Sequence, residues 1–145
     1  MCVPCVAPVG LFKMNPECNL ERLVLDTNIV IDLLKKIPAV VARFLDLQAS
    51  GTQILLSPIV IAEVYAGAFP REHKDIEALF DLCTCINMDS ETGRMAGNYA
   101  KHYAKSYQGI ALEDYILAAT AKNYRCPLWT HNRKHYPMED IELFL

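Results

Sequence analysis

The stretch Leu23-Val24-Leu25-Asp26-Thr27-Asn28 is a short apolar run that stops abruptly on a carboxylate and an amide. Val and Leu between polar breaks are typical of a buried strand in a parallel sheet. Asp26 then falls at the carboxyl end of that strand, where open α/β sheets bind their ligands. The alternative is that Asp26 or Asn28 only caps the following helix, because both side chains accept hydrogen bonds from the first helical amides.

Helices and strands alternate along the rest of the chain. Apolar residues at helical spacing, with capping and breaking residues at the ends, predict helices over 29–36, 38–50, 58–67, 71–82, 90–107 and 112–124. Short apolar runs predict further strands over 54–56, 83–88, 126–130 and 141–145. This alternation indicates a parallel α/β sheet that is covered by helices on both faces.

The length and composition are those of one globular domain. The chain has 145 residues, 52% of them hydrophobic and 21% charged, so it can bury a substantial core. Its net charge of −3 argues against nonspecific adhesion to nucleic acid, but leaves room for a local basic rim. The longest apolar run is interrupted by Pro58 and Glu63 and cannot span a membrane. We expect a cytoplasmic protein, since the first residues make a poor secretory signal.

The first 20 residues have no clear period and contain three prolines. We expect an irregular leader over residues 1–20 and a single domain over residues 21–145. The leader holds Cys2, Cys5 and Cys18, of which the first two form a C-x-x-C. No fourth ligand is apparent, so we expect reduced thiols and no zinc site.

Glu63 is a carboxylate on an otherwise apolar helix. Its neighbours at three and four residues' distance are Ile59, Val60, Ala66 and Gly67. A carboxylate in such surroundings is costly to bury unless it is paired or bound to a cation. The alternative is a glutamate at a solvent-facing edge of the helix, because charged residues are mostly exposed.

Asp114 and Asn132 lie on two further segments expected to face the sheet. Asp114 has Leu117 and Ala118 at three and four residues' distance, on the apolar side of its helix, whereas Glu113 is explained by the helix dipole. Asn132 follows the strand at 126–130, within a polar and basic run. Carboxylate and amide oxygens without imidazole or thiolate suit Mg²⁺ or Mn²⁺. A divalent ion held there supports metal-assisted hydrolysis of a phosphodiester.

Four segments, in this order, resemble the four motifs of PIN domains, and most closely those of the VapC-type toxins. The resemblance covers residues 22–145. The matching segments are Leu23-Val24-Leu25-Asp26-Thr27-Asn28, Ser57-Pro58 through Ala62-Glu63-Val64-Tyr65-Ala66-Gly67, Asp114-Tyr115-Ile116-Leu117-Ala118-Ala119-Thr120-Ala121 and Thr130-His131-Asn132-Arg133-Lys134-His135-Tyr136.

The resemblance implies a three-layer α/β/α sandwich with a central parallel sheet and a Mg²⁺- or Mn²⁺-dependent endoribonuclease site. It assigns Asp26, Glu63 and Asp114 as metal ligands, directly or through water. Asn132 joins this catalytic set at a position where the family often has aspartate. It also implies a homodimer that is inhibited by a cognate antitoxin protein. Supporting hydrogen bonds are expected from Asn28 and Thr130, and contacts with the RNA phosphate from Arg133, Lys134 and His135.

Two other functions are compatible with the same residues. The first is a catalytically inactive PIN-like module that binds RNA or protein, which the crowding of Asp26, Glu63 and Asp114 disfavours because such charges repel without a cation. The second is a phosphohydrolase with Asp26 as a covalent nucleophile. That chemistry favours a second aspartate two residues later, where this chain has Asn28.

Overall fold

A five-stranded, entirely parallel sheet forms the centre of the protein, in the order β3-β2-β1-β4-β5. The computed structural model describes residues 20–144. The strands are β1 (Arg22–Leu25), β2 (Gln53–Leu56), β3 (Thr84–Cys85), β4 (Leu128–Trp129) and β5 (Leu143–Phe144). The leader predicted over residues 1–20, with Cys2, Cys5 and Cys18, lies outside the described residues except for Leu20, which is buried in the core.

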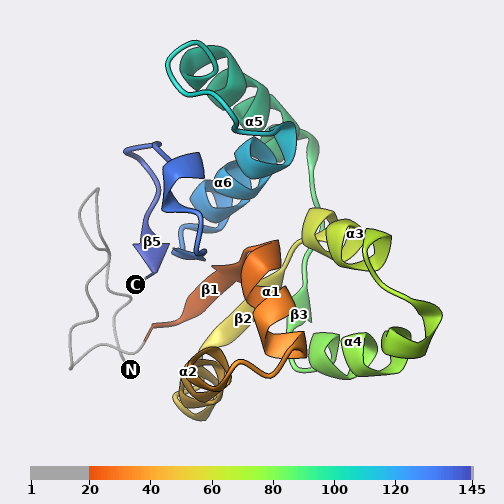
Figure 1. The fold of residues 1–145 in the computed structure, drawn as a ribbon. Helices are drawn as coiled ribbons and strands as arrows, with labels where there is room; N and C mark the ends of the chain where they lie inside the picture. The colour runs from red at the N-terminus through yellow and green to blue at the C-terminus, as the bar shows by residue number, and fades with distance from the viewer. Residues whose placement is uncertain (1–19, 145) are drawn as a thin grey trace.

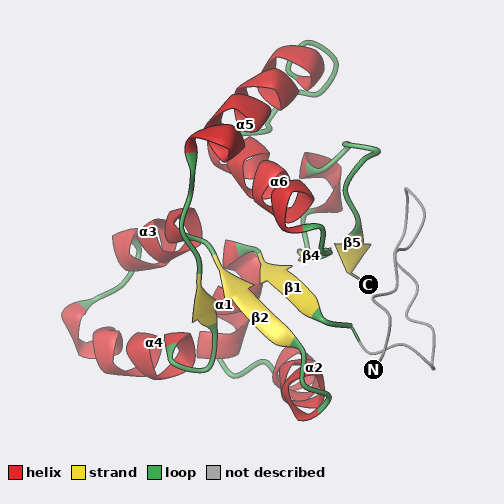
Figure 2. Ribbon diagram, turned by 180° about the vertical axis from the view of Figure 1, so that it is seen from behind, coloured by secondary structure: helices red, strands yellow, loops and turns green. Residues whose placement is uncertain are grey.

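Helices cover both faces of the sheet and complete the predicted three-layer α/β/α sandwich (Figure 1). The order of strands reverses direction after β3, so right-handed crossovers place the helices before and after β3 on opposite faces. Figure 2 shows α1 on the far side of β1 and β2 from the viewer. The first group contains α1 (Thr27–Leu34), α2 (Pro38–Ala49), α3 (Pro58–Ala66), the 3-10 turn η1 (Pro70–Glu72) and α4 (His73–Phe80), and the second contains α5 (Ser90–Tyr103) and α6 (Leu112–Tyr124).

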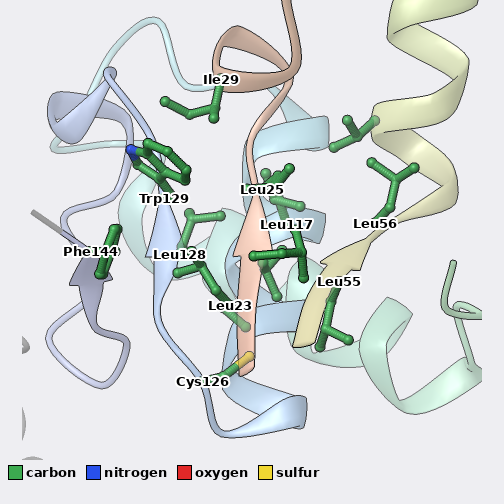
Figure 3. Packing of buried hydrophobic residues seen from close by; sticks show 14 of the residues in the cluster. Leu23, Leu25, Ile29, Leu55, Leu56, Leu117, Cys126, Leu128, Trp129 and Phe144 are labelled. Atoms are coloured by element: carbon green, nitrogen blue, oxygen red, sulfur yellow. The ribbon is translucent and has the colours of Figure 1, made fainter. Parts of the chain in front are cut away.

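The core fills both sides of β1, the middle strand. Leu23 and Leu25 are fully buried, and Leu117 of α6 packs against this strand, with Leu55 of β2 and Leu128 of β4 on either side (Figure 3). A strand buried on both faces explains why its sequence is a continuous apolar run and not an alternating one. The same run ends at Asp26, because the chain there leaves the sheet and starts α1.

Several elements are shorter than their sequence pattern predicts. The edge strand predicted over 83–88 pairs only at Thr84 and Cys85, and the strand predicted over 126–130 pairs only at Leu128 and Trp129. Helix α5 ends at Tyr103 and not at 107, because the next residues tighten into turns that lead to Gly109, which has φ +85°. Of the tyrosines on this helical face, Tyr99 is buried and Tyr107 is exposed.

Two further observations concern the helices and the cysteines of the described residues. No helix within residues 20–144 is long and apolar enough to cross a membrane. Cys83, Cys85 and Cys126, the cysteines within this part of the chain, are free thiols. Burial raises the pKa of the Cys83 and Cys126 thiols to about 12, so both keep their protons at neutral pH.

Candidate active site

Asp26 lies between β1 and β4, at the point where the strand order of the sheet reverses. Its side chain is buried, and its two oxygens have different partners. Oδ1 accepts a hydrogen bond from the Thr27 backbone N–H at 2.7 Å, so Asp26 does cap α1. Oδ2 accepts from Thr130 Oγ1 at 2.6 Å. Asp26 therefore caps α1 through Oδ1, while its Oδ2 makes the contacts of the candidate site.

Asp114 reaches the same place from the first turn of α6. Its Oδ2 accepts a hydrogen bond from the Ala111 backbone N–H at 3.0 Å, which orients the carboxylate at the start of the helix. His135 Nδ1 lies 3.1 Å from the same oxygen. The remaining oxygen, Oδ1, faces the hydroxyl of Tyr136 at 3.4 Å.

Tyr136 connects the two carboxylates. Its buried hydroxyl lies 3.1 Å from Asp26 Oδ2 and 3.4 Å from Asp114 Oδ1. Burial, together with the charges of Asp26 and Asp114, raises the pKa of Tyr136 far above its usual value, so the hydroxyl stays protonated. One hydroxyl proton serves one acceptor at a time. The hydroxyl therefore donates to either Asp26 or Asp114, and Asp26 Oδ2 keeps the hydrogen bond from Thr130 in both cases.

Glu63 approaches the pair from α3. Its Oε1 accepts a hydrogen bond from Thr27 Oγ1 at 3.0 Å, next to the Asp26 cap. Glu63 is exposed, as the solvent-facing alternative predicted. Desolvation of its partly buried carboxyl still raises its pKa, and the charges of Asp26, Glu113 and Asp114 raise it further, against the lowering effect of the Thr27 hydrogen bond. The negative charges of three other carboxylates therefore act on Glu63. This includes Glu113, which the sequence assigned only to the helix dipole.

Asn28 and Thr130 form the hydrogen-bonded wall behind Asp26. Asn28 Nδ2 lies 3.4 Å from both Asp26 Oδ2 and Thr130 Oγ1, and its Oδ1 accepts from the His131 backbone N–H at 3.2 Å. Thr130 Oγ1 accepts from the Asn132 backbone N–H at 2.9 Å. These bonds join the ends of β1 and β4. Asn132 contributes to this network through its backbone, and its side chain is exposed.

The three basic residues after Asn132 have different positions. Arg133 and Lys134 are exposed on the 3-10 turn η2 (Arg133–His135). His135 is partly buried against Asp114 and is the one of the three that contacts a predicted ligand. The structure therefore places His135 at the carboxylate pair and leaves Arg133 and Lys134 available to a larger molecule.

The donor set fits a hard divalent cation that keeps much of its water. Within residues 20–144, no three His, Cys, Asp or Glu side chains lie close enough together to be direct ligands of one ion. Mg²⁺ seldom uses such all-protein cages and is usually held by one or two carboxylates and several waters. Asp26 and Asp114 would supply two such carboxylates to an ion at this position, and Glu63 lies on the neighbouring helix α3 with its carboxylate on Thr27. Mutual repulsion among these groups is what a cation would relieve.

The raised pKa of Glu63 predicts a pH-dependent decrease in the free energy of unfolding of the metal-free protein. A carboxyl whose pKa is raised by folding above its ordinary 4.5 destabilises the fold at pH values above the raised pKa. This destabilisation disappears as the pH falls below 4.5, because Glu63 is then protonated in both the folded and the unfolded protein. In chelator at neutral pH, we expect Glu63→Gln to unfold at a higher temperature than the wild type, with the difference lost near pH 4.

Thermal unfolding of both proteins between pH 4 and 8 measures this effect. Glu139→Gln, at an exposed glutamate, is the matched control and should follow the wild type throughout. A Glu63→Gln protein that is less stable than the wild type at pH 7 would contradict the prediction.

Comparison with known proteins identifies the family. Residues 23–140 match the model of the PIN domain. The chain is 33% identical over 114 residues to Ribonuclease VapC19 of Mycobacterium tuberculosis, covering 79% of this chain and 91% of that protein. It is 27% identical over 117 residues to Ribonuclease VapC1 of Haemophilus influenzae, covering 77% of this chain and 87% of the relative.

Solved structures share this fold. VapBC2 from Rickettsia felis, bound to a DNA fragment from its promoter, superposes with a TM-score of 0.75 at 21% identity, covering 85% of this chain and 97% of that one. VapBC-1 from nontypeable Haemophilus influenzae superposes with a TM-score of 0.73 at 24% identity, covering 85% and 96%. The chain therefore belongs to the PIN domain family, with the VapC ribonucleases among its relatives.

Proposed function

We propose that this protein is a Mg²⁺- or Mn²⁺-dependent endoribonuclease and the toxin component of a toxin–antitoxin pair. The observation that carries the proposal is the meeting of Asp26 and Asp114 at one tyrosine hydroxyl, at the reversal point of a parallel sheet. The relatives named as VapC ribonucleases support RNA as the substrate. Neighbouring structures described as VapBC complexes support an antitoxin partner.

Each side chain of the candidate site has its own role in the proposed hydrolysis. Asp26 and Asp114 would hold the ion, with Glu63 and Asn132 at its outer side. The ion supplies charge neutralisation at the phosphate and a more acidic bound water. Thr130, Asn28 and Tyr136 keep Asp26 oriented, and His135 does the same for Asp114. Arg133 and Lys134 extend outward on η2, where they would meet the phosphates of a bound strand.

An activity screen tests the proposal directly. The purified chain is incubated with structured RNAs in Mn²⁺, in Mg²⁺ and in EDTA. We expect cleavage at discrete positions in the metal-containing reactions and none in EDTA. Cleavage that persists in EDTA would contradict metal dependence. Binding of RNA without cleavage in any metal would instead favour the inactive binding module. Light scattering on the same sample tests the expected homodimer.

Metal binding also predicts a gain in thermal stability. An ion that binds only the folded state at 100 times its dissociation constant stabilises by about 2.7 kcal/mol. For a chain of this size we expect a rise of about 5–10 °C in unfolding temperature. Asp114→Asn should reduce the rise strongly, because it removes one of the two carboxylates proposed to hold the ion.

The matched control for this titration is Asp75→Asn, at an exposed aspartate on α4. It should show the full metal-dependent rise. Equal rises in the wild type and in Asp114→Asn would place the bound ion elsewhere on the protein.

A further inference from the structure

A separate hollow opens beside the carboxylate site, on the other side of Thr130. It has a volume of about 290 Å³ and lies between α2, the end of β4, η2 and β5. Its lining includes Arg43, Trp129, Thr130, His131, Arg133 and Phe144. Thr130, one of the lining residues, donates its hydroxyl to Asp26 Oδ2 at 2.6 Å. The hollow and the candidate metal site therefore share one wall.

Positive charge in the hollow is not neutralised by nearby carboxylates. No Asp or Glu within residues 20–144 forms an ion pair with Arg43 or Arg133. His131 is different, because its Nε2 lies 2.8 Å from Asp32 Oδ2. Two guanidinium groups are thus left for an anion that enters from outside, and guanidinium is the side-chain group best matched to phosphate.

The floor of the hollow is aromatic. The rings of Trp129 and Phe144 pack edge to face with their centroids 5.6 Å apart, and Figure 3 shows them side by side on β4 and β5. The Arg43 guanidinium lies over the Phe144 ring at 4.3 Å. A guanidinium plane stacked in this way is a platform on which unpaired RNA bases stack.

The geometry points to a nucleotide subsite in this hollow, which would bind the RNA residue next to the scissile phosphodiester through Arg43 and Arg133. The inference rests on the proposed function, because it takes RNA as the substrate. Shared use of Thr130 puts the subsite beside the proposed point of cleavage. The volume is near the lower end of ligand pockets, which suits one nucleotide and not a folded segment. An acidic peptide would form ion pairs with the two arginines but would have no base to stack on the Arg43 guanidinium.

Binding of a fluorescein-labelled single-stranded RNA to the full chain tests the subsite. Anisotropy is measured over a series of salt concentrations in the D26N background, which prevents cleavage. We expect Arg43→Ala and Arg133→Ala each to raise Kd about tenfold or more. Each should also reduce the slope of log K against log salt by about 0.7, the value for one phosphate contact with a single strand. Arg43→Lys should restore the slope but not the full affinity, because lysine keeps the charge and loses the plane.

The chain offers a matched control in Arg71, whose guanidinium lies over the exposed Phe69 ring at 4.6 Å, at the start of η1. Arg71→Ala removes the same kind of stack outside the hollow and should bind RNA like the D26N parent. Arg133 is exposed, so its variant keeps the test valid if Arg43→Ala fails to fold.

In the active protein, Arg43→Ala should raise KM for a long RNA and leave kcat nearly unchanged. Arg43→Ala and Arg133→Ala proteins that bind as tightly as Arg71→Ala, while the wild type cleaves the same RNA, would overturn the subsite alone. Displacement by poly-glutamate with no effect of either arginine on RNA binding would assign the hollow to an acidic partner and also overturn it. Absence of cleavage by the wild type would contradict the proposed function itself.

Discussion

Asp26→Asn should abolish metal-dependent RNA cleavage while leaving the protein folded. The substitution removes the charge from the carboxylate that Thr130, Asn28 and Tyr136 orient. Loss of a residue behind a metal ligand typically costs about 10–100-fold in affinity or activity, so loss of the ligand charge itself should cost more. Initial rates with Mn²⁺ on a single RNA substrate measure the effect.

The fold should survive because asparagine keeps the hydrogen bond that caps α1. Asn caps helices as well as Asp does, so the Thr27 N–H keeps an acceptor. The hydroxyl of Thr130 can rotate to accept from the new amide. Removing one negative charge beside Glu63 and Asp114 should also relieve repulsion in the metal-free protein. We therefore expect an unfolding temperature in EDTA at or above that of the wild type.

Asp75→Asn again serves as the control, since it makes the same chemical change at an exposed position. Undiminished cleavage by a folded Asp26→Asn protein would refute the assignment of Asp26. A protein that fails to fold would contradict the expectation that asparagine can replace Asp26 in the folded structure.

Tyr136→Phe should have the second largest effect. The substitution removes the hydroxyl that lies between Asp26 and Asp114 and keeps the buried ring. A hydrogen bond to a charged group contributes about 1.5–3 kcal/mol, and the freed carboxylates lose their fixed separation. We expect cleavage to fall about 10–100-fold, as for other residues that orient a metal ligand.

The dependence of activity on Mn²⁺ concentration distinguishes a positioning role of Tyr136 from general structural damage. Tyr136→Phe should require a higher Mn²⁺ concentration for half-maximal activity, and excess Mn²⁺ should recover part of the rate. Tyr107→Phe, at an exposed tyrosine beyond the end of α5, should change neither. A loss of rate that is the same at all Mn²⁺ concentrations would contradict the positioning role.

The sequence predicted the architecture because each segment carries its own pattern. The apolar run ending at Asp26, the Ser57-Pro58 start of α3 and the acidic first turn of α6 are local signals, and each element is found where predicted. The lengths of β3 and β4 were overestimated, because pairing depends on the neighbouring strand and not on the propensity of the segment.

The contacts within the candidate site were harder to predict. Asp26, Glu63 and Asp114 stand out by their apolar context, but nothing in the sequence pairs Glu63 with Thr27 or places His135 on Asp114. Tyr136 ends the fourth matching segment but was given no role, since a tyrosine after a basic run has no periodicity that marks it. Its role arises only when β4 pairs beside β1 and brings the following loop over Asp26. Such contacts depend on tertiary packing, which a single sequence does not display.

The pairing of β1 with β4 also determines when this protein becomes complete during its synthesis. Asp26 leaves the ribosome 104 residues before Thr130 and 110 residues before Tyr136, the two residues that hold its carboxylate. A nascent chain thus carries the first acid without the partners that orient it. Any cutting of RNA by this protein would begin only after the segment with Thr130 and Tyr136 has emerged and packed beside β1.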